Sequence, residues 1–242
     1  GQAVDEEVIR TLYDELRGQP GLTSWFGELL TETYNPDPQK PITMANYDEA
    51  YGAATHILPN NNILNLISKV DKPPYDEMVI EFFKTDEKIE FKFNNKDINY
   101  LYMNGVIDEE KEEDGKYYLK FSCPFVQKSL FDFFSSHFFN YLGQLIHPLD
   151  AMNDAFAGDS LLVRPIIKRY QAYLTKNQAV FFKDAPRRKK DMRIYEAIYH
   201  FNLYRYLFDL LRNRGVEVIP QFPTGNGKID LIWRSSRPLR KP

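Results

Sequence analysis

Residues Lys96–Ser122, KDINYLYMNGVIDEEKEEDGKYYLKFS, decide how the middle of the chain is expected to fold. The segment KDINYLYMN (Lys96–Asn104) has the apolar pattern of a short helix. GVID and KYYLKFS (Lys116–Ser122) have the composition of two strands, joined by an acid-rich turn. The sequence therefore predicts a helix that is followed directly by a hairpin with a charged tip.

The residues before this hairpin extend the pattern. Pro74–Lys84 is predicted to be helical, and KIEFKF (Lys88–Phe93) alternates charged and apolar residues as a half-exposed strand does. A helix, a short strand, a helix and a two-stranded hairpin follow one another in the order of a winged-helix domain. We therefore expect such a domain within residues 59–143.

Helical periodicity dominates the rest of the chain. VEVIPQF and KIDLIW, on either side of PTGNG, are predicted strands. The aromatic stripe of the helix that begins at Pro124 is expected to lie in the core. The predicted class is α+β and mostly helical, with these further helices: Val4–Arg17, Leu22–Tyr34, Asn46–His56, Asn61–Val70, Pro124–Tyr141, Asp159–Lys183 and Met192–Asn213.

Composition places the chain among ordered globular proteins. Its 242 residues are 43% apolar and 15% aromatic, which suffices for one or two domains with a sizeable core. The formal charge of −3 gives no global attraction to nucleic acid or membrane, and the single cysteine, Cys123, excludes an internal disulfide. No apolar run is long enough to cross a bilayer, so we expect a cytoplasmic protein with no membrane partner.

Charge is concentrated in two runs. DEEKEEDG (Asp108–Gly115) is expected to be a solvated loop, as acidic runs usually are. The basic run, together with the Arg and Lys residues of the tail, allows two interpretations, which are solubility and contact with nucleic acid. It consists of Arg187, Arg188, Lys189 and Lys190.

Several familiar motifs are excluded. GNGK (Gly225–Lys228) lacks the spacing of a phosphate-binding loop, and a predicted strand follows it where that loop needs a helix. The four histidines are scattered, so a structural zinc site is not expected.

Two stretches resemble parts of one protein family. EAIYHFNLYRYLFDLLRNRGVEVIPQFPTGNGKIDLIW (Glu196–Trp233) resembles the first half of the PD-(D/E)XK nuclease-like domain appended to bacterial AAA/STAND-type ATPases. DEEVIRTLYDELRGQPGLTSWFGELL (Asp5–Leu30) resembles the helical lid of those ATPases. The resemblance implies four parts: a lid-like region (1–58), the winged helix (59–143), a helical connector (144–190) and half of a nuclease-like domain (191–242).

The resemblance also implies roles for individual residues. Asp230 would be the first metal-binding carboxylate, Glu196 would be the helical Glu that accompanies it, and Lys228 belongs to the same candidate catalytic set. The family then places a Glu-x-Lys strand, whose Glu shares the Mg²⁺ and whose Lys serves the attacking water. Because RSSRPLRKP follows Trp233 instead, the chain is expected to be a fragment without competent nuclease chemistry.

The lid-like turn differs from the family pattern as well. The usual turn is Gly-Gly-His-Pro, and here it is Gly18-Gln19-Pro20. Gln19 and Pro20 would lie near the phosphates of ATP held by an ATPase domain that this sequence does not contain. The Glu-x-Lys tripeptide at Glu90–Lys92 precedes Asp230 in the chain, whereas the family order is the reverse. We therefore interpret it as part of an ordinary strand.

Three functions stay open at this point. The chain could be the regulatory and effector part of an ATPase–nuclease-like protein, or a nucleic-acid-binding module that contacts phosphates through Arg187–Lys190. The alternative is a protein-interaction scaffold or a proteolytically released fragment. KDINYLYMN carries one Lys and one Asp, and the hairpin tip is acidic, so we expect the winged helix to contact protein. The oligomeric state is left open.

Overall fold

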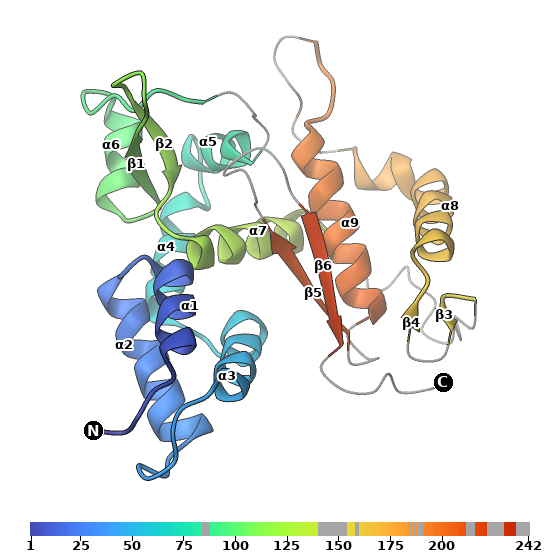
Figure 1. The fold of residues 1–242 in the computed structure, drawn as a ribbon. Helices are drawn as coiled ribbons and strands as arrows, with labels where there is room; N and C mark the ends of the chain where they lie inside the picture. The colour runs from blue at the N-terminus through green and yellow to red at the C-terminus, as the bar shows by residue number, and fades with distance from the viewer. Residues whose placement is uncertain are drawn as a thin grey trace. The chain divides into compact units, whose positions relative to one another are not determined.

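The computed structural model describes residues 1–83, 88–139, 154–157, 160–183, 185, 187, 191–211, 216–221 and 230–235. The chain divides into two compact units, Gly1–Leu130 and Phe131–Pro242, and each is described by itself. Nine α-helices and three two-stranded antiparallel ladders lie in the described residues, which confirms the predicted α+β, mostly helical class (Figure 1).

The first unit opens with a helical part. Arg17 and Gly18 end α1 in the left-handed region, with φ of 49° and 71°, and Pro20 then opens α2 at a position where its missing N–H costs nothing. The predicted helix over Leu22–Tyr34 starts two residues earlier and ends in a π-helical turn. The elements are α1 (Glu6–Leu16), α2 (Pro20–Glu28), η1 (Leu29–Tyr34), α3 (Met44–His56) and α4 (Asn61–Val70).

The second part of this unit contains the predicted hairpin. Asn95 caps α6 (Lys96–Met103) by accepting hydrogen bonds from the backbone N–H groups of Asp97 and Ile98, and Gly105 (φ +72°) turns the chain into the hairpin. The strands β1 (Ile107–Lys111) and β2 (Tyr117–Phe121) pair antiparallel. The preceding helix is α5 (Tyr75–Phe82).

KIEFKF was predicted to be a strand, and in the structure it forms an isolated bridge from Glu90 to Tyr118 of this hairpin. Phe91 N–H donates to the carbonyl of Tyr117 at 2.8 Å, and Leu119 N–H donates to the carbonyl of Ile89 at 2.9 Å. The segment thus adds a short third row to the ladder. The acidic run differs from its prediction, because Asp108–Lys111 belongs to β1 and only the residues after it form the turn. Pairing with β2 holds this acid-rich stretch in an extended conformation.

The helix α7 (Pro124–Phe139) begins in the first unit and ends in the second. Its aromatic stripe is core, as predicted: Phe131, Phe134 and Phe139 are at most 1% exposed. In the second unit the ring of Phe131 lies 4.8 Å from Phe201 and 5.3 Å from Tyr204, centroid to centroid.

The remaining elements belong to the second unit. A short ladder that the sequence did not predict, β3 (Phe156–Ala157) with β4 (Ser160–Leu161), precedes α8 (Val163–Phe181). The helix α9 (Glu196–Leu211) is followed by the antiparallel strands β5 (Val216–Gln221) and β6 (Asp230–Ser235). Among the described helices, none combines the length and the apolar character needed to cross a membrane.

Candidate functional site

The helix α9 and the strands β5 and β6 carry the residues that the resemblance singled out. Four residues connect α9 to β5, and the two elements pack together, so the chain reverses direction between them. Gln221 at the end of β5 pairs with Asp230 at the start of β6. Asp230 therefore stands at the end of the hairpin where β5 ends and β6 begins.

Glu196 lies in the first turn of α9. Its side chain is 79% exposed, and its Oε1 lies 3.8 Å from Nε2 of His200. That separation is too long for a hydrogen bond. Burial lowers the pKa of His200, and the charge of Glu196 acts in the opposite direction. The Glu196 carboxylate is thus open to solvent and held by no strong partner that the structure describes.

A Mg²⁺ site needs more ligands than the described residues around Glu196 supply. Mg²⁺ takes oxygen ligands, commonly one or two carboxylates with several waters. Glu196 supplies one exposed carboxylate, and the side chain of Asp230 lies outside the described part. The described residues contain no group of three His, Cys, Asp or Glu side chains that could hold a metal ion. By themselves they do not make up the site, and we derive no chemical step through the metal.

The basic run is described at one position. Arg187 donates from its guanidinium to the carbonyls of Phe182 and Met192, both at 3.3 Å, and its backbone bridges to Ile194. These contacts close the loop between α8 and α9, so Arg187 has a structural role that the sequence did not indicate. The other predicted residues of the run and of the catalytic set, Arg188, Lys189, Lys190 and Lys228, lie outside the described residues.

The lid-like turn contacts the hairpin part of its own unit. Gln19 precedes Pro20, the first residue of α2, and is half-buried. A Cβ built on Gly105 would lie 3.7 Å from Nε2 of Gln19, so the Gln19 amide points toward the turn between α6 and β1. A change at Gln19 would therefore be felt directly at the start of the hairpin.

A second connection in the first unit is ionic and nearly buried. Lys128 of α7 is 10% exposed and donates to both carboxylate oxygens of Glu15 of α1, at 2.8 and 2.9 Å. It also donates to the hydroxyl of Tyr51 of α3 at 3.0 Å, and that hydroxyl donates to Glu15. Three helices that are distant in sequence thus share one satisfied polar cluster.

The Glu-x-Lys tripeptide in KIEFKF has a structural environment. Glu90 bridges to Tyr118 of β2, and its carboxylate lies 3.5 Å from the Lys92 ammonium. Both side chains are largely exposed, 46% for Glu90 and 62% for Lys92. A surface ion pair of this kind agrees with our interpretation of the tripeptide as an ordinary strand.

The helix α8 was predicted within Asp159–Lys183, but its basic character was not recognised. Residues 160–183 contain five basic residues and no acidic one, and the basic residues are Arg164, Lys168, Arg169, Lys176 and Lys183. The sequence contained this signal, because no acidic residue lies among these basic residues over about six turns of the predicted helix.

Comparison with known proteins adds no relative. No family model, no curated protein and no solved structure matches this chain.

Proposed function

We propose that this chain is a regulatory and effector part of a bacterial ATPase–nuclease-like protein whose target is nucleic acid. The observation that supports the proposal is the α9–β5–β6 element. Its helix begins with the exposed Glu196, and its second strand begins with Asp230, which pairs with Gln221 at the end of β5. This is the arrangement that the family resemblance leads one to expect.

In this proposal the first unit passes on the state of a nucleotide. ATP would be bound by an ATPase domain that is a partner of this chain, with Gln19 and Pro20 near its phosphates. The contact of Gln19 with the Gly105 turn and the cluster of Glu15, Tyr51 and Lys128 then supply a physical connection from the lid-like helices to the hairpin and α7.

The nuclease-like part is proposed to be incomplete in this chain. When Mg²⁺ is bound in a completed site, it stabilises the charge that develops on the phosphoryl group and helps to generate hydroxide. Glu196 and Asp230 would be ligands or would position them, and a Glu-x-Lys strand would complete the set. The sequence after Asp230 contains no Glu-x-Lys, so we expect the 242 residues alone not to cleave nucleic acid.

The test is to read the coding sequence downstream of Pro242 and to express a chain extended through any Glu-x-Lys strand found there. We expect the extended chain to cleave a labelled oligonucleotide with Mg²⁺, and Asp230→Ala to abolish cleavage while the circular dichroism spectrum is unchanged. Arg193→Ala, which changes an exposed residue near Glu196, is the matched control. A downstream sequence without the motif, or cleavage that survives Asp230→Ala, would contradict the proposal.

A protein-interaction scaffold is the second candidate, and the surface of the hairpin favours it. The exposed parts of β1 and of the turn carry Glu110, Glu113 and Asp114, and these acids repel phosphate. A basic protein surface would suit them better. Charge reversal at Glu110 and Glu113 that abolishes capture of the ATPase domain, without change in nucleic-acid binding, would favour this function for the first unit.

A further inference from the structure

The exposed side of α8 carries a row of cations. At 100° per residue, Arg164, Lys168 and Thr175 fall within about 40° of one another around the helix, on the side opposite the buried Ile166 and Tyr173. Arg164 and Lys168 have no ion-pair partner among the residues that the structure describes, whereas Arg169, farther round the helix, pairs with Asp154. Within the described part of the chain, the row is therefore a positive stripe that no ion pair neutralises.

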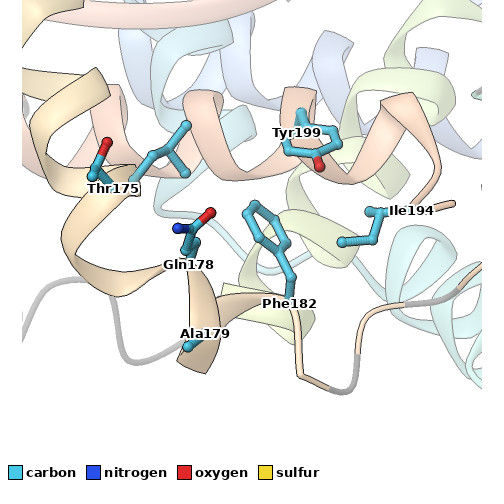
Figure 2. A pocket seen from close by; sticks show the side chains of 7 residues that line it. Thr175, Gln178, Ala179, Phe182, Ile194 and Tyr199 are labelled. Carbon is cyan, nitrogen blue, oxygen red and sulfur yellow. The ribbon is translucent and has the colours of Figure 1, made fainter.

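This stripe leads into a hollow at the C-terminal end of α8. The hollow has a volume of about 460 Å³ and is formed by α8, by Phe182 directly after it and by α9 (Figure 2). Figure 2 shows the ring of Phe182 projecting between Gln178 and Ile194, with the ring of Tyr199 facing it from α9. Its lining residues are Leu174, Thr175, Gln178, Ala179, Phe182, Ile194 and Tyr199.

The hollow offers aromatic surface beside polar groups. The ring centroids of Phe182 and Tyr199 lie 4.9 Å apart. Tyr199 is 41% exposed and Phe182 only 8%, so Tyr199 supplies the accessible aromatic face and Phe182 supports it from below. The side chains of Thr175 and Gln178 add a hydroxyl and an amide to the wall. Arg187, bound to the carbonyl of Phe182, adds positive charge next to the hollow.

Cations in a row and an aromatic surface at its end are the two features that bind single-stranded nucleic acid: the cations follow the phosphates and the rings stack on bases. An anionic membrane fits less well. An amphipathic membrane helix needs large apolar side chains on the face that it buries in lipid. The exposed apolar residues of α8, Val163 and Val180, lie far round the helix from the face that carries Lys168.

The geometry points to a binding site for single-stranded nucleic acid on the second unit, with phosphates along Arg164 and Lys168 and a base in the hollow against Tyr199. The site is formed by other residues than Asp230 and those of the β1–β2 hairpin. The inference rests on the proposed function, in which nucleic acid is the target. It adds that the nucleic acid is single-stranded and that α8 and the hollow bind it.

The experiment measures fluorescence anisotropy of a labelled oligothymidylate of about 16 nucleotides, and of a duplex of equal length, with the full chain over a range of salt concentrations. Arg164→Glu/Lys168→Glu should weaken binding of the single strand at least tenfold. It should also reduce the slope of log K against log salt by about 1.4, which corresponds to two lost phosphate contacts. Tyr199→Ala should weaken binding of the single strand about tenfold with an unchanged salt slope.

Matched controls are taken from the first unit. Lys72→Glu/Lys96→Glu makes the same change of charge at two exposed lysines, and Tyr13→Ala removes a tyrosine that is 61% exposed. Both should leave the affinity within about twofold of the unchanged chain, because neither touches α8. Circular dichroism spectra of all variants should coincide.

Four outcomes would overturn the inference. The first is no binding by the unchanged chain, and the second is an affinity that both charge-reversed pairs lower equally. The third is a duplex bound as tightly as the single strand, with no loss of affinity in Tyr199→Ala. The fourth is tighter binding to phosphatidylserine vesicles than to the oligonucleotide. Failure here is distinct from failure of the proposed function. An extended chain that loses cleavage but not binding in Asp230→Ala separates the two sites.

Discussion

The basic side chains of α7 and the hairpin in the first unit and those of α8 in the second have opposite surroundings. In the first unit Lys128 is held by Glu15 and Tyr51, and Lys88 and Lys120 lie close to acids of the hairpin. In the second unit α8 presents Arg164 and Lys168 to solvent with no acidic partner in the described residues. The difference separates charge that serves the fold from charge that is available to a ligand.

The comparison is tested most strongly by removing one lysine from each unit. Lys128→Met should lower the free energy of unfolding by about 3 kcal/mol, because it leaves the Glu15 carboxylate, 21% exposed, without its cation. Lys168→Met removes a surface charge that has no ion-pair partner among the described residues. It should change the free energy of unfolding by less than about 0.5 kcal/mol. Urea unfolding followed by circular dichroism measures both.

Equal effects of the two substitutions would contradict the assignment of Lys128 to structure and Lys168 to binding. Glu15→Leu combined with Lys128→Met should recover much of the loss, since replacing both members of a buried pair by apolar residues is often neutral.

A smaller effect tests whether polar side chains also stabilise the core of the second unit. The hydroxyl of Tyr204, a residue 1% exposed, donates to the Asp132 carboxylate at 2.9 Å, and burial raises its pKa so that it stays a donor. Tyr204→Phe should cost about 1.5 kcal/mol of unfolding free energy, because the bond is to a charged acceptor.

The control for this substitution is Tyr199→Phe, which removes a hydroxyl from a residue that is 41% exposed and lines the hollow. We expect its unfolding midpoint in urea to match that of the unchanged chain. A Tyr199→Phe chain as destabilised as Tyr204→Phe would mean that Tyr199 serves the core and not the surface.

The smallest expected effect concerns the ionisation of the Asp114 carboxyl in the hairpin. The hydroxyl of Tyr118 donates to Asp114 at 2.7 Å, which holds the pKa of that carboxyl below its ordinary value and raises the pKa of Tyr118. Because the lowered pKa belongs to the folded state, the ionised carboxylate favours folding above its ordinary pKa. This contribution is lost as the pH falls through the lowered value.

Tyr118→Phe should move the pKa of Asp114 upward, toward its ordinary value, in an NMR titration of the side-chain carboxylates. Asp154 is the internal reference, because the pKa of its carboxyl is lowered by Arg169 in the other unit and should not move. An Asp114 titration that the substitution leaves unchanged would show that the pairing within the hairpin is weaker than its geometry implies.

Local sequence was sufficient for most helices. The predicted helix Asn61–Val70 agrees with α4 in both bounds, and Asn60 caps it by accepting from the N–H groups of Asn62 and Ile63. The predicted Lys96–Asn104 differs from α6 by one residue. Both depend on contacts within about one turn of the chain, so a short window of sequence contains what determines them.

Local sequence failed where the partner is distant along the chain. The acid-rich Asp108–Lys111 has little strand propensity and was expected to be a solvated loop, but pairing with Tyr117–Lys120 makes it part of β1. The short β3–β4 ladder likewise consists of two residues a strand and leaves no periodic signal.

The candidate sites divide in the same way. The sequence alone named Glu196 and Asp230 and identified the turn at Gln19, because these residues lie in short motifs that a resemblance can detect. Only the tertiary structure showed that Gln19 points toward Gly105, that Arg187 closes a loop, and that the α8 cations lead into an aromatic hollow. Such contacts join residues from separate elements, and packing, not local conformation, sets the distances between them.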